Sequence, residues 1–243
     1  MRVIKGRMKP INLSFAACGF LGIYHLGAAS AFCRHGKRLL KDVKAFAGAS
    51  AGSLVASVLL TAPEKIEECN RFTYQFAEET RKQSFGALTP GYDFMARLRY
   101  MFTQRISPPP QVLEDRVLNA LQQSVPSAAL ALVKYLQSCS IINGSFGQQL
   151  CAHLLGTETS GIQRAGRTVT ISPFCGRLDI SPQDKGQLSV YIKVTNQDIM
   201  LSLPNLMRLN QALFPPSRRK MESLYRRGFD DTVQFLHKED WFE

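Results

Sequence analysis

KAFAGASAGSLVA, residues 44–56, is the stretch that decides the fold. A short apolar run ending at Ala47 enters Gly48-Ala49-Ser50-Ala51-Gly52, and a second apolar run leaves it. Gly-x-Ser-x-Gly between a strand and a helix is typical of a nucleophile elbow, where the serine occupies a strained turn between closely approaching backbones. The pattern predicts Ser50 as the nucleophile and Gly48 and Gly52 as the elbow glycines.

The predicted position of Ser50 at a helix N-terminus suits acyl transfer. Free N–H groups and the positive end of the helix dipole stabilise an oxyanion that develops there. A pattern this short also arises by chance, so the rest of the chain must decide between a catalytic turn and a purely structural one.

The length and composition indicate a globular α/β protein. A chain of 243 residues, 45% hydrophobic and 20% charged, forms one domain with a sizeable core, or two small ones; we favour a single domain over residues 1–243. Six cysteines lack paired spacing and no Cys/His cluster has zinc spacing. We therefore expect reduced thiols in a cytoplasmic protein, with no metal site.

The charge predicts an anionic partner. The formal net charge is +11 and the pI is about 9.6, which favours nucleic acid or a membrane surface. The basic residues are dispersed and no nucleic-acid-binding signature accompanies them. We expect an anionic lipid surface and no nucleic acid; a solvated basic surface without a specific partner is the alternative.

The uncharged stretch 10–33 has two interpretations. Behind a basic head it resembles a signal anchor, but its glycines and polar residues dilute the hydrophobicity that a spanning helix needs. We therefore predict a strand at Ile11–Ala17, a glycine turn at Cys18–Gly22, and a buried helix to about Cys33. His25 falls inside that helix and is predicted as a core histidine rather than a base.

The glycine turn is the second candidate site. Backbone N–H groups between a strand and a helix can cradle a phosphate or form an oxyanion hole. Ala17 replaces the first glycine of a dinucleotide fingerprint, and no acidic residue follows at the ribose spacing. We predict no nucleotide and no cofactor; a turn needed only for packing is the alternative.

Periodicity predicts the remaining elements. Residues 51–61 are apolar all round and 63–83 are amphipathic. The composition changes from 107 to 165, where we expect poor order beyond 141. The predicted elements are helices at 112–121 and 128–136, strands at 167–174 and 188–194, and helices at 198–213 and 219–237.

With both turns in place, the sequence resembles the patatin-like phospholipases, a family of lipid acyl hydrolases. The resemblance rests on INLSFAACGFLGIYHLGAASA and on FAGASAGSLVASVLLTAPEKIEECNRFTYQFAEE. It covers residues 9–99 and 166–243; residues 1–8 are an extension and 100–165 a replaced segment, as from alternative splicing or a shifted reading frame. The resemblance implies a three-layer α/β/α fold, incomplete or poorly ordered in the middle segment.

The resemblance also implies a Ser-Asp dyad with Ser50 as nucleophile. The family's oxyanion loop maps onto Ala17, Cys18, Gly19 and Gly22, and the N–H of Ala51 follows the serine. The family's aspartate begins an Asp-Gly-Gly or Asp-Gly-Ala motif, and this chain contains no Asp-Gly pair. The aspartate base is therefore not found, and neither Asp179 nor Asp115 has the glycine turn that would expose it.

These observations predict a serine hydrolase or transacylase of triacylglycerol or retinyl esters, acting in triglyceride catabolism and lipid homeostasis. We expect it to be peripheral on lipid droplets or membranes, and impaired because the base is missing. A lipid-binding pseudoenzyme and a membrane-anchored protein remain open as alternatives, and no oligomeric state is predicted.

Overall fold

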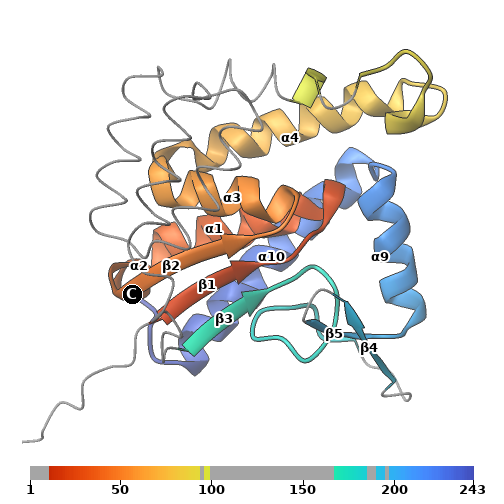
Figure 1. Ribbon diagram of the computed structural model, residues 1–243. Coiled ribbons are helices and arrows are strands. Elements are labelled where there is room, and N and C mark those ends of the chain that lie inside the picture. The colour runs from red at the N-terminus through yellow and green to blue at the C-terminus, as the bar shows by residue number, and fades with distance from the viewer. Residues whose placement is uncertain (1–10, 94–95, 99–166, 185–189, 195–196) are drawn as a thin grey trace, which may run out of the picture.

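The computed structural model describes residues 11–93, 96–98, 167–184, 190–194 and 197–243 (Figure 1). The predicted helices at 112–121 and 128–136 and the stretch from 141 to 166 lie outside these ranges, as do residues 1–8 and Asp115.

A parallel sheet forms the centre of the fold. Strand β1 (Ile11–Phe15) lies between β2 (Val43–Gly48) and β3 (Arg167–Ile171), in the order β2-β1-β3. Phe15 is in register with Gly48 on one side and Ile171 on the other, so all three strands end at the same edge. Ile180 adds an isolated parallel bridge to Ile171. Strands that alternate with helices in this way are typical of α/β proteins.

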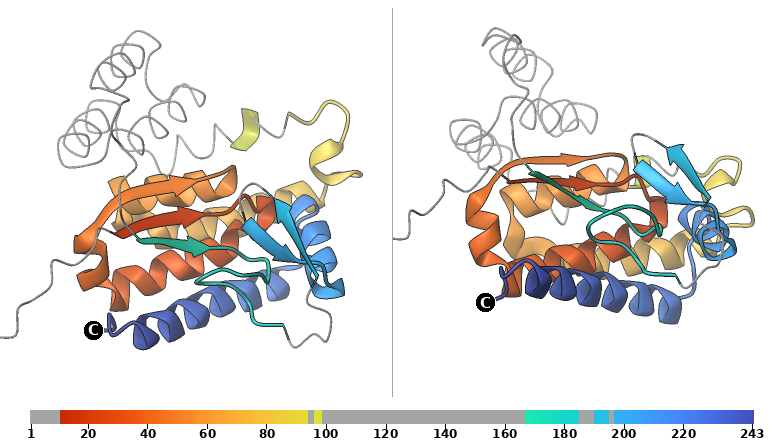
Figure 2. Two further views of the ribbon diagram at one scale, coloured as in Figure 1. Left: turned by 60° about the horizontal axis from the view of Figure 1, so that its bottom comes forward. Right: turned by 90° about the horizontal axis from the view of Figure 1, so that it is seen from below.

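Four helices lie on the same face of this sheet (Figure 2). They are α1 (Gly22–His35), α3 (Ala51–Thr61), α4 (Ile66–Arg81) and α10 (Arg218–Lys238). Ile11, Leu13 and Phe15 alternate along β1 and are buried, because side chains two apart on a strand point to one face. The mixed α/β fold class is therefore confirmed, and the described residues supply the sheet and one helical layer.

Close packing of α1 against α10 forms the middle of the core. A side-chain carbon on Gly27 would lie 2.0 Å from the Tyr225 carbonyl oxygen, so the two helix backbones are in contact there. Nearby, the Tyr24 hydroxyl donates to Oδ2 of Asp231 at 2.7 Å. Burial raises the pKa of Asp231, although the Tyr24 hydrogen bond and Arg227 oppose that shift.

The remaining described elements connect the sheet and these helices. They are η1 (Gly19–Leu21), α2 (Lys37–Asp42), η2 (Pro63–Lys65), η3 (Gly86–Leu88), the antiparallel hairpin of β4 (Tyr191–Val194) with β5 (Gln197–Met200), and α9 (Leu203–Leu213). Figure 1 shows α9 standing beside the carboxyl ends of β1 and β2.

The prediction of a helix beginning at Asp198 was wrong. Asp198 and Met200 belong to β5, because Met200 pairs with Tyr191 across the hairpin and donates its N–H to the Cys175 carbonyl. The helix begins only after Ser202, whose hydroxyl accepts a hydrogen bond from the Asn205 N–H. A serine followed by Leu203 and a proline is a helix-start signal, and it overrides the weaker periodicity before it.

The N-terminal apolar stretch belongs to the core. Residues 11–35 form β1, η1 and α1, and α1 is buried from Gly22 to Phe32. The predicted strand ends earlier than expected, at Phe15, and the charged connection before β2 folds into α2. Among the residues the structure describes, no helix is long and apolar enough to cross a membrane.

Candidate active site

Ser50 lies on the sharp turn between β2 and α3. Its backbone angles are φ 52° and ψ −127°, and Ser50 and Asp240 are the non-glycine residues with positive φ among those described. Such a conformation costs on the order of 1–3 kcal/mol and persists only where the surrounding structure imposes it. Ser50 is exposed and occupies the N-cap of α3, yet its hydroxyl makes no capping hydrogen bond. The hydroxyl is therefore presented to solvent at the positive end of a helix dipole.

Two glycines impose this turn. A side-chain carbon on Gly48 would lie 2.6 Å from the carbonyl group of Gly52, so the strand and the helix touch through these residues. A side-chain carbon on Gly52 would lie 2.4 Å from the Ala16 oxygen. The Ala49 N–H donates to the Phe15 carbonyl at 3.1 Å, which fixes the turn to β1. Close backbone approach is the physical reason for the two glycines.

The glycine turn after β1 lies against the serine turn. An added side-chain carbon on Gly22 would lie 3.3 Å from Cβ of Ala51, the residue that follows Ser50. Gly19 has φ 50°, a left-handed conformation that glycine adopts without strain. The structure thus brings together the two turns that the sequence singled out separately.

The N–H groups of these turns differ in availability. The N–H of Gly22 donates to the Gly19 carbonyl inside η1, so Gly22 contributes space rather than a donor. The N–H groups of Cys18, Gly19 and Ala51 donate no hydrogen bond within the described part of the chain. Three unpaired backbone donors beside an exposed serine hydroxyl form an arrangement that can receive a developing oxyanion.

Cys18 itself is not a second nucleophile. Its side chain is buried, and burial raises the pKa of the thiol far above its usual range. A thiol that stays protonated neither attacks an ester nor binds a metal ion. Among the described residues, no group of His, Cys, Asp and Glu side chains could hold a metal ion.

His25 supports the turns from inside the core. The side chain is fully buried in α1, and its Nε2 donates to the Ala16 carbonyl oxygen at 3.0 Å. Its ring meets the ring of Phe15 edge-on, with centroids 5.3 Å apart. Burial lowers the pKa of His25 to about 4, so the imidazole is neutral at pH 7. The prediction of a core histidine is confirmed, but no sequence pattern indicated its hydrogen bond to the Ala16 carbonyl.

Asp179, the candidate substitute base, lies beyond the outer edge of β3, at the edge of the sheet away from β2. Its Oδ2 accepts from the Thr170 N–H at 2.9 Å and from the Thr170 hydroxyl at 2.8 Å, and Oδ1 accepts from Arg167. The Thr170 carbonyl accepts from the N–H of Ile180, so this edge of β3 faces away from β1. Strands β1 and β3 therefore stand between Asp179 and the strand that carries Ser50.

Comparisons with known proteins identify the family to which the chain is similar. Residues 13–179 match the family model of patatin-like phospholipases. Patatin-like phospholipase domain-containing protein 4 of Homo sapiens is 62% identical over 97% of this chain and the whole of that protein. Patatin-like phospholipase domain-containing protein 2 of Mus musculus is 29% identical over 93% of this chain and 50% of the relative.

A further relative carries a transferase name. The 1-acylglycerol-3-phosphate O-acyltransferase Pnpla3 of Mus musculus is 28% identical over 93% of this chain and 59% of its own length. The chain thus spans all of one relative and only about half of the other two. No solved structure matches the chain.

Proposed function

Since the chain belongs to the patatin-like phospholipase family, we propose that it is a lipid acyl ester hydrolase or transacylase that uses Ser50 as its nucleophile. One observation carries the proposal: the exposed hydroxyl of Ser50 lies on a strained turn, next to N–H groups of Cys18, Gly19 and Ala51 that have no acceptor among the described residues. Backbone donors placed this way stabilise charge without reorganising during the reaction.

The reaction proceeds by acyl transfer through the serine. Oγ of Ser50 attacks the ester carbonyl carbon and loses its proton to a base, and the three N–H groups receive the oxyanion. Collapse of the tetrahedral intermediate expels the alcohol, which takes a proton as it leaves. Water then releases the acyl group as a fatty acid, or a second alcohol accepts it in a transacylation.

The base determines how active this chain is. Asp179 is held by Thr170 beyond β3, away from the serine turn, and the chain contains no Asp-Gly pair. A serine hydroxyl without a base is a weak nucleophile at neutral pH. We therefore propose that the chain as it stands is impaired, and that its substrates are neutral acyl esters of the triacylglycerol or retinyl ester kind.

A lipid-binding pseudoenzyme is the second candidate, and the missing base favours it. In both cases we propose that the protein is cytoplasmic and peripheral on lipid droplets or membranes, attracted through its net charge of +11. We propose that the hydrolase acts in triglyceride catabolism.

Labelling with a fluorophosphonate serine probe separates the two candidates. Slow labelling of the full chain that disappears in Ser50→Ala, but persists in the exposed-serine control Ser223→Ala, supports the hydrolase. Absence of labelling at any probe concentration, in protein with an unchanged thermal transition, would favour the pseudoenzyme.

A further inference from the structure

Helix α9 exposes its apolar side chains and buries a polar one. A surface helix ordinarily directs its apolar side chains to the core and its polar side chains to water. In α9 the buried residues are Asn205 and Ala212, whereas Leu206 and Leu213 are each 61% exposed. We define the outer face of α9 as its exposed large apolar residues with the capping phenylalanine: Leu203, Leu206, Met207, Leu209, Leu213 and Phe214.

Polar contacts hold the inner face of α9 in place. The Asn205 amide donates to the carbonyl groups of Cys175 and Met200 at 2.8 and 2.7 Å, and its oxygen accepts from the Cys175 N–H at 2.9 Å. Arg208 makes a two-point ion pair with Asp184, in which both side chains are largely buried. These contacts fix the orientation of α9, so its apolar residues cannot simply rotate into the core.

The outer face borders the candidate active site. A side-chain carbon on Gly19 would lie 2.2 Å from the Ala212 carbonyl oxygen, so the end of α9 rests on the glycine turn. Figure 1 shows the helix beside the edge of the sheet where that turn lies. An added carbon on Gly86 would lie 3.8 Å from the Phe214 ring, and the neighbouring Phe85 is also exposed. The apolar surface therefore continues past the end of the helix.

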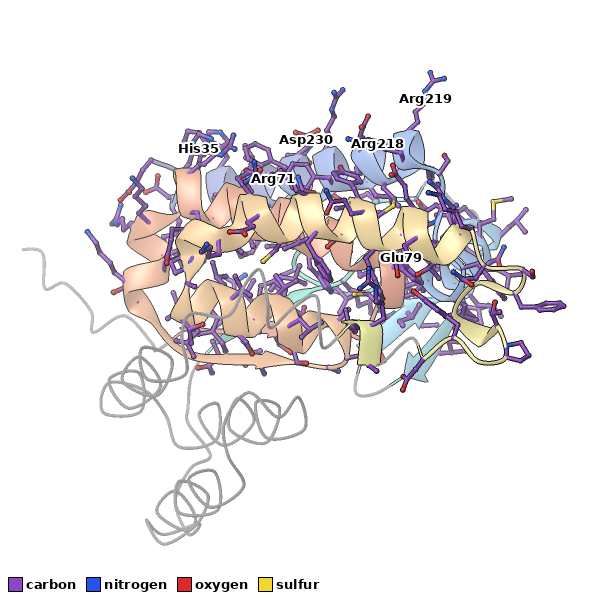
Figure 3. All side chains as sticks on the ribbon, turned by 90° about the horizontal axis from the view of Figure 1, so that it is seen from above. His35, Arg71, Glu79, Arg218, Arg219 and Asp230 are labelled. Atoms are coloured by element: carbon purple, nitrogen blue, oxygen red, sulfur yellow. The ribbon has the colours of Figure 1, made fainter. Side chains whose placement is uncertain are left out.

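The charges around this face favour an anionic surface. Residues 203–214 contain no Asp or Glu. Directly after them, Arg219 and Lys220 are exposed in the first turn of α10, and Figure 3 shows Arg219 projecting away from the body of the protein. Arg81 donates to the Pro216 carbonyl at 2.8 Å, which places the end of α4, with Lys82, at the same corner. Arg218 is balanced by Glu78 and Glu222.

We propose that the outer face of α9 inserts into an anionic phospholipid surface and so holds the serine turn at the boundary of the acyl phase. The role of this surface in delivering lipid esters to Ser50 rests on the proposed function. Its position on the protein rests on the geometry of α9. Apolar residues above a lipid headgroup layer gain free energy by leaving water, and flanking Lys and Arg add attraction to anionic headgroups. A large exposed apolar patch on one helix marks such an interaction site.

Vesicle binding tests this proposal. The full chain is mixed with vesicles of phosphatidylcholine and phosphatidylserine, and binding is measured by co-sedimentation. We expect Leu206→Ser/Leu213→Ser to weaken binding by about tenfold or more, because two leucines no longer leave water. The control variant is Ser84→Ala/Ser223→Ala, which changes one exposed serine after α4 and one on α10. It should bind vesicles as the unchanged chain does.

The same samples show whether a second copy of the chain, or a segment of the same chain, covers the outer face of α9 instead of lipid. Their thermal transitions show whether the variant is folded. Equal vesicle binding by the leucine variant and the unchanged chain overturns the proposal. Self-association of the chain that the variant abolishes, without a change in vesicle binding, overturns it in favour of a second copy. A lower thermal transition in the variant with unchanged vesicle binding overturns it in favour of a covering segment of the same chain.

Probe labelling in lipid-free solution separates this inference from the proposed function. The leucine variant should label at Ser50 at the same rate as the unchanged chain, because both leucine side chains are largely exposed on the outer face and their backbone positions are unchanged. Loss of vesicle binding with no labelling of either protein would remove the hydrolase and leave the docking surface intact.

Discussion

Gly52 packs against the carbonyl group of Ala16 so closely that a side-chain carbon on Gly52 would lie 2.4 Å from that oxygen. The same oxygen accepts the hydrogen bond from His25. One main-chain carbonyl thus joins the helix after Ser50, the end of β1 and the buried histidine of α1.

Gly52→Ala should destabilise the protein strongly. The added carbon meets main-chain atoms that cannot move without displacing β1 from α3, so we expect the free energy of unfolding to fall by about 2 kcal/mol or more. Urea denaturation measures this change. Ser53→Ala, one residue along α3, should change the stability by less than about 1 kcal/mol; an equal loss in both variants would show that contact with Ala16 is not the cause.

Ser50→Gly should stabilise the protein while removing its nucleophile. Glycine adopts φ 52° without strain, so relief of strain outweighs the entropy that glycine loses on folding, with a net gain of about 1 kcal/mol. Ser50→Ala keeps the strain and should leave the stability nearly unchanged. Thermal and urea unfolding of both variants test this; a Ser50→Gly protein less stable than Ser50→Ala would contradict the strained turn.

His25 should make the protein less stable in mild acid. Its pKa is about 4 in the folded chain and 6.5 in the reference state, so between these values the unfolded chain binds the proton and the folded chain does not. Stability from this residue is therefore fully present above pH 6.5 and falls as the pH drops to 4, by about 3 kcal/mol over the window.

Two measurements check the histidine prediction. NMR titration of the His25 ring gives its pKa in the folded chain directly, and a value near 6.5 would contradict the burial argument. Urea denaturation across the same pH range should show a shallower slope for His25→Gln, whose amide can still donate to the Ala16 carbonyl.

Binding to anionic vesicles should decrease as salt increases. The net charge of +11 acts through surface attraction that is screened over about 8 Å at physiological ionic strength. Co-sedimentation at rising salt concentration measures the effect. Arg219→Gln/Lys220→Gln should bind less tightly at low salt and depend less on salt. Equal binding to neutral and anionic vesicles at low salt would rule out the electrostatic contribution.

Restoring an aspartate should raise the rate of ester hydrolysis by several orders of magnitude. The variant replaces residues 100–165 with a family-type segment that contains Asp-Gly-Gly, and a short-chain ester reports the rate. Ser50 and its N–H donors are unchanged, so the gain measures the base. Both proteins must be soluble with matched thermal transitions. Full activity of the present chain, abolished by Ser50→Ala, would instead show that another residue is the base.

The sequence alone was sufficient to locate both turns. Gly48 and Gly52 identify the elbow around Ser50, because only glycine fits where the backbones of the strand and the helix touch. The two glycines lie close together in the chain, so this requirement is visible as a short sequence pattern. The same holds for Gly19, whose left-handed conformation is a property of one residue. The α/β class followed from apolar periodicity, since the strand and helix repeats differ along the chain.

Other features depend on tertiary contacts that no spacing records. Asp179 is remote from Ser50 because β1 and β3 lie between them, and the order of strands is set by pairing between distant segments. Met200 joined a strand rather than a helix because its N–H found the Cys175 carbonyl. A surface helix ordinarily buries its leucines. In α9 the buried hydrogen bonds of Asn205 hold the helix with its leucines exposed, and this orientation depends on contacts with Cys175 and Met200 that only the folded chain makes.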